Sequence, residues 1–186
     1  METTGMRMPG RIARLAVIGA TIGGAGAAAG AEFRDPKTGL AVNPPPGFTA
    51  RLGKASMGDT VEIEVERETP PASCTVSFQE SAANRSLTQQ QINDMTGKPE
   101  WLELIRTAMG AMHEIIVLES RTQDGAVGAV LVVKPKMEML AKFRTYQALF
   151  ETPRGRTVVQ CTASQDRFDG LRQDYDAITA GVTLPR

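Results

Sequence analysis

The first 31 residues constrain this chain most, because they have the composition of an export signal and not of a folded domain. Three arginines make a basic start, an apolar run extends from Leu15 to Ile22, and small residues fill 23–31. The small residues Ala29 and Ala31 fit the requirement of signal peptidase, so we expect the mature chain to begin at Glu32. Two alternatives are cleavage after Ala29, which leaves Gly30 first, and an uncleaved leader that acts as a membrane anchor.

Without the leader, 155 of the 186 residues remain, which is enough for one domain with a single substantial core. The expected organisation is a signal peptide at 1–31 and a single domain at 32–186. The leader holds three of the 21 basic and one of the 21 acidic residues, so the domain carries 18 and 20, a net charge of −2. Nucleic acid is therefore not an expected partner, because proteins that bind it carry a basic excess. The local basic cluster within 134–144 is interpreted as a solvated turn and its flanks.

Two cysteines, Cys74 and Cys161, lie in runs that predict strands far apart in the sequence. In an oxidising compartment outside the cytoplasm, an isolated pair of this kind is usually a disulfide. We expect one bond that links two distant parts of the sheet; the alternative is two separate buried thiols. The chain has no C-x-x-C pair and no cysteine directly after the apolar run that could accept a lipid.

Strand patterns flank a central helical region. Residues 60–67 alternate apolar and charged side chains, which predicts a half-buried strand with Val61, Ile63 and Val65 facing the core. Further strands are expected at 35–43, 72–80, 115–122, 126–134, 144–152 and 156–163. Asp124-Gly125 and a Pro-Arg-Gly turn at 153–155 separate the later ones.

Helical periodicity covers 86–112 and 166–180. Ser86 and Gln89 form a capping-box pattern that predicts the start of a helix, and Gly97 is expected to end it. Pro99 predicts the start of a second helix. Its apolar positions predict a buried stripe: Trp101, Leu102, Ile105, Met109 and Met112. The last helix is expected to end at Gly181 and to bury one face: Phe168, Leu171, Tyr175 and Ile178. Strands, helix, hairpins and helix in this order predict an α+β domain with a mostly antiparallel sheet.

The run Thr38–Phe48, with its strand, proline triplet, glycine and aromatic residue, resembles the entry of the PsbP/Mog-like superfamily, in particular its bacterial periplasmic, DcrB-like branch. The closing segment 166–184 resembles the last helix and terminal strand of that superfamily. The resemblance implies a three-layer α/β/α sandwich with a curved antiparallel sheet, and roles in binding, assembly or envelope maintenance. Phe48 stands where the superfamily usually has tryptophan.

No motif of catalysis or metal binding is present. His113, the only histidine, is followed by Glu114 but not by the second histidine of a zinc-protease motif, and its place after a helix favours a capping role. Alternating glutamates at 62, 64 and 66 lie too far apart to share one ion and are interpreted as a solvated strand face. We therefore expect no catalytic residue, no cofactor and no metal site.

Trp101, Met109 and Met112 are the candidate ligand or partner surface. Trp101 either packs in the core or faces a ligand at the rim of a cleft. Met109 and Met112, with Met95, Met137 and Met139, either fill the core or form a deformable apolar surface, and core packing is the favoured interpretation.

The sequence thus predicts a periplasmic or secreted, non-enzymatic protein that acts in envelope assembly or maintenance. Its expected partner is another envelope protein, a lipid or a small ligand, bound at the sheet or in the cleft beside 86–112. Membrane association is expected only through an uncleaved leader. The alternative is a periplasmic enzyme with a cleft of carboxylates and arginines that no sequence motif marks.

The cleavage prediction is tested by intact-mass measurement on protein recovered from the periplasm. We expect the mass of a chain that begins at Glu32, or at Gly30 if the earlier site is used, because small residues precede both positions. A mass that includes the leader would contradict cleavage and would favour the anchor.

Overall fold

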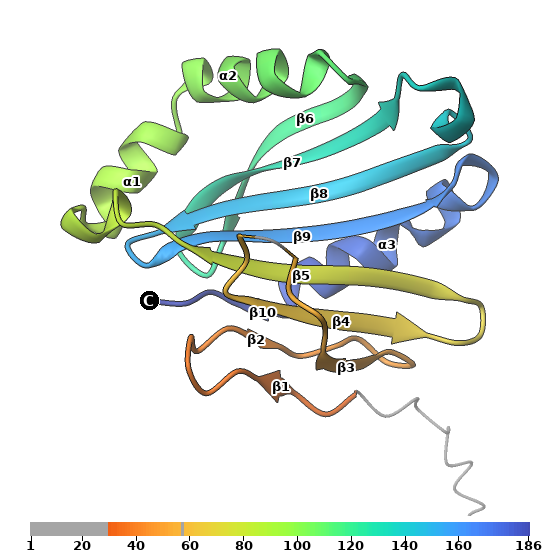
Figure 1. Cartoon of the computed structure of the whole chain (residues 1–186), viewed down its shortest axis with the longest axis horizontal. Helices are drawn as coiled ribbons and strands as arrows, with labels where there is room; N and C mark the ends of the chain where they lie inside the picture. Colours follow the sequence, from red (N-terminus) through yellow and green to blue (C-terminus); the bar gives the residue numbers. More distant parts are fainter. Residues whose placement is uncertain (1–29, 57) are drawn as a thin grey trace, which may run out of the picture.

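The described part of the chain folds into two antiparallel sheets and three α-helices (Figure 1). The computed structural model describes residues 30–56 and 58–186, so the expected leader lies outside the described residues except for its last two positions. The large sheet has the order β3-β4-β5-β9-β8-β7-β6, and the small sheet has the order β1-β2-β10.

The strands of the large sheet are β3 (Thr49–Leu52), β4 (Val61–Arg67), β5 (Ala72–Glu80), β6 (His113–Gln123), β7 (Ala126–Pro135), β8 (Phe143–Thr152) and β9 (Gly155–Ser164). Those of the small sheet are β1 (Phe33–Arg34), β2 (Ala41–Val42) and β10 (Val182–Thr183). The helices are α1 (Gln89–Thr96), α2 (Pro99–Gly110) and α3 (Gln165–Ala180), with single 3-10 turns at Asn84–Ser86 and Glu138–Leu140.

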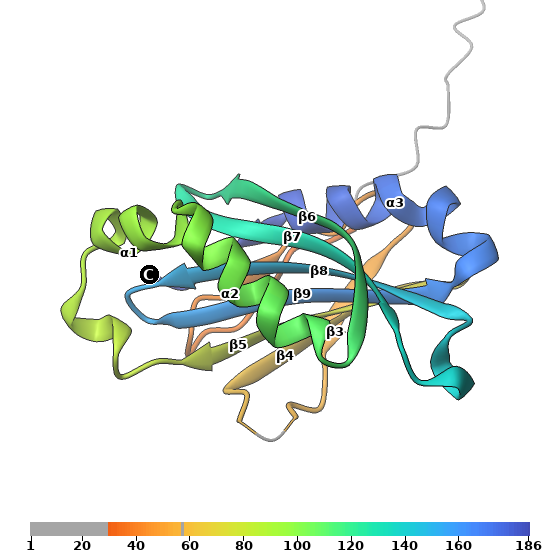
Figure 2. The same ribbon diagram turned by 90° about the horizontal axis from the view of Figure 1, so that it is seen from above.

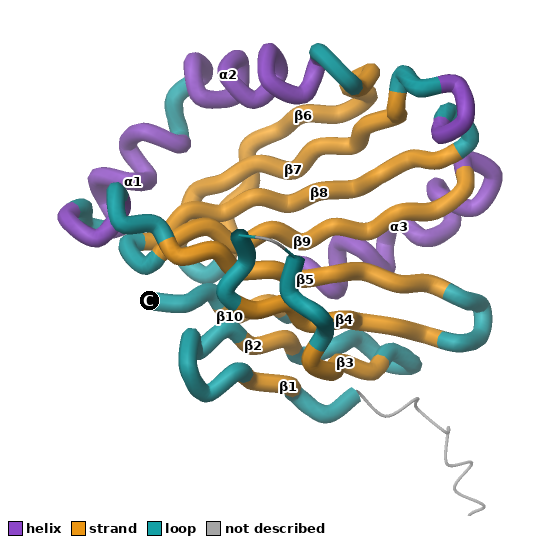
Figure 3. Tube along the Cα trace, in the orientation of Figure 1, coloured by secondary structure: helices purple, strands orange, loops and turns teal. Residues whose placement is uncertain are grey.

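Helices lie on both faces of the large sheet, as the predicted three-layer α+β sandwich requires (Figures 1 and 2). Helix α3 and the small sheet cover one face, called here the inner face. Helices α1 and α2 lie over the opposite, outer face at the β6–β8 end. The tube view shows how the strands curve across the molecule between these helices (Figure 3).

Alternation along β4 places its apolar side chains in the core, as predicted. Val61, Ile63 and Val65 are buried, whereas the glutamates between them are only partly buried. Arg51 on β3 forms ion pairs with Glu64 and Glu66, the latter at 3.1 Å. The row of carboxylates is therefore a charge-compensated strand face, in agreement with its interpretation from the sequence.

The pairing of β5 with β9 joins the two halves of the large sheet. Cys74 and Cys161 lie opposite each other in this register, and their sulfur atoms form a disulfide between two cysteines separated by 87 positions. The other neighbouring strands of the sheet connect through hairpins or loops that are much shorter. The predicted disulfide thus crosses the pairing with the longest sequence separation in the large sheet.

Two hairpin turns that the sequence predicts are present. Asp124 and Gly125 both have positive φ, 48° and 72°, as the tight turn between β6 and β7 requires. Gly155 begins β9 at the turn after β8, where a Cβ atom would lie 2.0 Å from the carbonyl oxygen of Gln79. A side chain at this position would displace the backbone of β5.

Helix α3 buries its predicted face against the inner side of the sheet. Phe168, Leu171, Tyr175 and Ile178 are all buried. They belong to one buried cluster with apolar side chains of the sheet, among them Val76, Phe78, Val130, Val132, Tyr146, Ala148, Phe150 and Val159. This layer is the core of the domain.

A charged network ties α3 to the sheet beside this core. Asp176 on α3 accepts hydrogen bonds from Arg121 on β6, at 2.5 Å, and from the Tyr146 hydroxyl on β8, at 3.1 Å. Arg172 bonds the other oxygen of Asp176 and lies over the Tyr146 ring at 5.0 Å. Burial raises the pKa of Tyr146 to about 12, so its hydroxyl stays protonated and can donate to Asp176.

Three expectations about local structure are wrong. The opening strand is limited to β2, because a turn stabilised by Asp35 and Thr38 occupies the start of the predicted range. The capping box belongs to Thr88 and Gln91, two residues after the predicted Ser86–Gln89 pair, because a 3-10 turn occupies Asn84–Ser86. Helix α2 has no fully buried residue, so its apolar stripe is not a core stripe.

The disulfide is expected to contribute strongly to stability. For a separation of 87 residues, the chain-entropy model predicts that a Cys74→Ala/Cys161→Ala variant loses about 4–5 kcal/mol of unfolding free energy. Denaturant unfolding of the two proteins measures the difference. Wild-type protein unfolded in the presence of reductant is the control, and its unfolding free energy should fall by a similar amount. Two free thiols in exported protein that has never been reduced would contradict the bond.

Asp176 is expected to make stability sensitive to acid. Burial by itself raises the pKa of this carboxyl, but the bonds from Arg121, Arg172 and Tyr146 outweigh burial and lower the pKa below its ordinary value. The ionised carboxylate therefore stabilises the fold above the unfolded-state pKa of about 3.9, and this contribution is lost as the pH falls through the lower folded-state pKa.

Unfolding free energy measured from pH 7 down to about 2 tests this contribution, because the range spans the unfolded-state value near 3.9. We expect Asp176→Asn to be less stable than wild type at neutral pH and to lose less stability on acidification. Asp169→Asn, which removes a carboxylate that is 85% exposed on the same helix, is the matched control. Parallel curves for wild type and Asp176→Asn would contradict the prediction.

Candidate functional site

An apolar groove of about 350 Å³ runs between α2 and the outer face of the sheet. Trp101, Ile105 and Met109 on α2 form one wall, with Leu104 and Ala108 beside them. The floor consists of Leu131 on β7, Leu149 on β8 and Val158 on β9, with Gln147 and Arg156 as its polar members. Leu149 and Val158 are direct register partners, whereas Leu131 is opposite Gln147, so the floor is an apolar area with one polar residue in it.

The groove exists because α1 is fastened to the sheet and α2 is not. Ile92 and Thr96 on α1 are buried, and the Thr96 hydroxyl donates to the carbonyl of Val127 at 2.7 Å. Asn93 adds bonds to the backbone of Gly125 and Val127. Among the described residues, no side chain of α2 bonds the sheet, and the helix packs mainly along β6 at the sheet edge. Its apolar stripe consequently faces the groove and stays half-buried.

The structure brings together two of the three residues predicted as a ligand or partner surface. Trp101 and Met109 line the groove, and both are half-buried, so core packing is the wrong interpretation for them. Met112 lies beyond the end of α2 and is 66% exposed, outside the groove lining. The sequence did not identify the floor residues. Inner and outer positions of β7 are both buried, so Leu131 gives no alternating pattern. Leu149 and Val158 are outer positions on alternating strands, and only the packing of α2 shows that they face a groove.

The remaining methionines are not core filler either. Met137 and Met139 are 59% and 74% exposed on the loop between β7 and β8, and Met95 is also exposed. Met137 and Met139 lie between Lys136 and Lys142 in the sequence. This segment is therefore a solvated turn, as predicted, and its methionines are not packed in the core.

Arg156 forms the charged end of the groove. Its Nε donates to Glu151 Oε1 at 2.6 Å, and the two residues are opposite each other on β9 and β8. Glu151 is buried, and its second oxygen accepts from Asn84 Nδ2 at 2.9 Å. The carboxylate is thereby fully engaged and fixes the guanidinium, whose Nη atoms have no hydrogen-bond partner within the described part of the chain.

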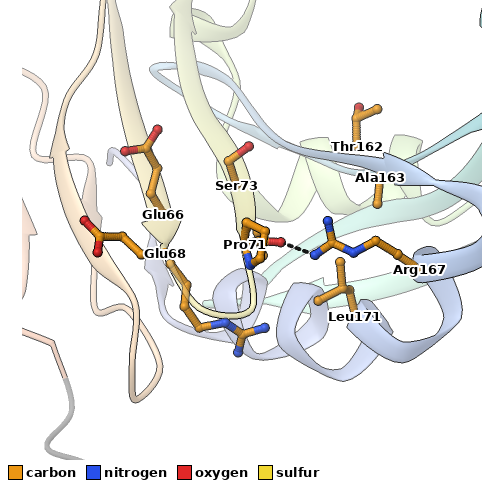
Figure 4. Close-up of a pocket in the computed structure, with 10 residues that line it drawn as sticks. Glu66, Glu68, Pro71, Ser73, Thr162, Ala163, Arg167 and Leu171 are labelled. Atoms are coloured by element: carbon orange, nitrogen blue, oxygen red, sulfur yellow. Dashed lines mark hydrogen bonds between the residues drawn. The ribbon is translucent and has the colours of Figure 1, made fainter.

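A second, polar groove of about 430 Å³ lies between the β4–β5 turn and the start of α3 (Figure 4). Arg167 points across it and donates to the carbonyl of Pro71. Glu66 also lines this groove but is paired with Arg51. Arg67 bonds the Pro70 carbonyl and Asp174, the latter at 2.7 Å. These contacts hold the hairpin against α3.

This polar groove is the closest match to the predicted alternative of a carboxylate and arginine cleft. Its lining contains no histidine and no free thiol, and the charged groups described above serve structural contacts. His113 lies far along the sheet, at the start of β6, where its Nδ1 is buried without a hydrogen-bond partner; the expected capping bond is not formed. No triad or acid–base pair is assembled from these residues.

Two further observations concern metals and membranes. Among residues 30–56 and 58–186, no group of three or more histidine, cysteine, aspartate or glutamate side chains is arranged to hold a metal ion. Within the same ranges, no helix is both long enough and apolar enough to cross a membrane.

Similarity to known proteins is visible in the fold and not in the sequence. No protein-family model and no curated protein matches this chain. The solution structure of cyanobacterial PsbP (CyanoP) from Synechocystis sp. PCC 6803 has a TM-score of 0.53 at 18% identity, covering 87% of this chain and 96% of that chain. A crystal structure from Bacteroides thetaiotaomicron has a TM-score of 0.54 at 10% identity, covering 86% and 50%.

A weaker match is LpqN of Mycobacterium tuberculosis, a protein involved in cell envelope biogenesis, with a TM-score of 0.49 at 12% identity and coverage of 84% and 91%. The match to CyanoP extends over nearly the full length of both chains. It shows that this chain has the PsbP-like fold and confirms the resemblance that its opening and closing segments indicate.

Proposed function

We propose that this PsbP-like chain is a non-enzymatic binding protein of the cell envelope that holds an apolar group of its ligand in the groove beneath α2. The observation that carries the proposal is the position of the apolar stripe of α2. A helix in a stable domain normally buries such a stripe, because burial stabilises by about 25 cal/mol per Å². Here the stripe faces an open groove with an apolar floor, which is the arrangement of a preformed ligand site.

The location outside the cytoplasm is supported by two independent features. The leader has the composition of an export signal. Cys74 and Cys161 form a disulfide, and disulfides form and persist in the oxidising compartments that exported proteins enter. A binding role in the envelope agrees with both features and with the absence of an assembled catalytic group among the groove residues.

Trp101 provides a direct test, because it is the only tryptophan of the chain and lines the groove. A neutral naphthylamine probe that fluoresces in apolar surroundings should bind to the mature protein and accept energy from Trp101. Ala108→Phe fills the groove without introducing a charge, so it should weaken probe binding by about tenfold or more. A tenfold change in Kd corresponds to about 1.4 kcal/mol of binding free energy.

Leu52→Phe is the matched control, since Leu52 is an exposed apolar residue on β3, away from the groove. It should bind the probe as wild type does. The proposal fails if wild-type protein does not bind the probe, or if Ala108→Phe and Leu52→Phe bind it equally well while both unfold like wild type.

A further inference from the structure

We infer that the natural occupant of the groove is a single hydrocarbon chain that ends in a carboxylate, with the carboxylate held by Arg156. This inference rests on the proposed function and adds the chemical class of the ligand. It follows from the size of the groove, its apolar walls and the arrangement of its one charged residue.

The groove has the size of a small-ligand site. It measures about 350 Å³, within the range of about 300–1,000 Å³ that is typical of such sites. An added β-strand is excluded, because the floor is the face of β7, β8 and β9, whose backbone groups are already paired with neighbouring strands. A strand needs a free sheet edge.

The long, apolar shape of the groove suits a flexible hydrocarbon chain. From Trp101 to Met109 the groove follows α2 over eight residues, about 12 Å of helix at 1.5 Å per residue. Its walls offer the deformable thioether of Met109 and the branched side chains of Ile105, Leu149 and Val158. Apart from Gln147, whose amide nitrogen already donates to Gln160, the lining beyond Trp101 along this length offers no hydrogen-bond partner to a polar ligand. An unsatisfied polar group would oppose binding.

Arg156 supplies the place for an anionic head group. Its side chain is 50% exposed, and Glu151 holds the guanidinium through Nε only. This leaves the Nη atoms for a second acceptor. A carboxylate matches the planar fork of an arginine, and a charge-assisted bond of this kind is about twice as strong as a neutral one.

The Arg156–Glu151 pair also excludes a cationic head group at this end. The buried carboxylate of Glu151 is shared between Arg156 and Asn84, so neither of its oxygens points to the groove without a partner. Arg156 is also the one charged residue among the described residues that line the groove. Its free Nη atoms therefore favour an anion at this end.

Displacement of the naphthylamine probe by dodecanoate tests the inference, with dodecanol and dodecyltrimethylammonium as ligands of equal chain length and different head groups. Dodecanoate and dodecyltrimethylammonium are used below the concentrations at which they form micelles, and dodecanol is used below its solubility limit. We expect dodecanoate to displace the probe at about tenfold lower concentration than dodecanol, as one charge-assisted hydrogen bond allows. The cationic ligand should be the weakest.

Two variants locate the head group. Arg156→Gln should bring dodecanoate to the affinity of dodecanol while the probe still binds. Arg156→Lys, which keeps a positive charge beside Glu151 and thereby protects the fold, should lose most of the preference because an ammonium lacks the fork. Arg85→Gln removes an equal charge from an arginine that does not line the groove, and it should retain the preference.

Equal displacement by dodecanoate and dodecanol in wild type would overturn the inference while the probe-binding groove remains. Retention of the preference in both Arg156 variants would overturn it as well. Displacement of the probe by an amphipathic helical peptide but not by dodecanoate would assign the groove to a protein partner and would also overturn it. Absence of probe binding in wild type is the separate result by which the proposed function itself fails.

Discussion

The antiparallel pairing of β5 with β9 is the constraint on which the rest of the structure depends. It is the junction between the strands that precede the helical region, β3 to β5, and the four strands that follow it. Bringing such distant segments together has a high entropic cost in the unfolded chain. The Cys74–Cys161 bond crosses this junction, so it lowers that cost at the longest-range pairing of the large sheet.

The two faces of this sheet have different roles. The inner face is closed by α3 and the small sheet, and it holds the aromatic and branched side chains of the core together with the Asp176 network. The outer face is covered only in part. Helix α1 is bound to the strand ends by its threonine and asparagine side chains, whereas α2 crosses the edge of the sheet and leaves an apolar area open. Stability is thus provided on one side, and the other side is available for a ligand.

This division makes the binding proposal compatible with a stable domain. Residues that line the groove contribute little to the core, so an occupant can enter without a rearrangement of the inner face. Arg156 is the exception, because it satisfies the buried Glu151. A residue that both stabilises a buried carboxylate and faces the groove links the fold to the binding chemistry, which is why the Arg156→Lys variant is needed beside Arg156→Gln.

Much of the fold follows from the sequence alone, because period-two and helical patterns are local properties. The alternation of β4, the buried face of α3, the Asp124-Gly125 turn and the proline-started α2 were all predictable in this way. The two cysteines indicated a disulfide because the leader placed them in an oxidising compartment. The predicted helix cap at Ser86 was wrong by two residues. A 3-10 turn takes up Ser86, and Thr88 and Gln91 form the capping box instead.

Only the tertiary structure decided where the apolar stripe of α2 points. A stripe at helical spacing has the same sequence pattern whether it packs in a core or faces an open groove; the attachment of α1 and the edge position of β6 determine which occurs. The floor of the groove and the Arg156–Glu151–Asn84 contacts come from segments up to about 70 residues apart, joined by sheet register. The sequence by itself determined the elements and the compartment expected for them, whereas long-range packing determined the site.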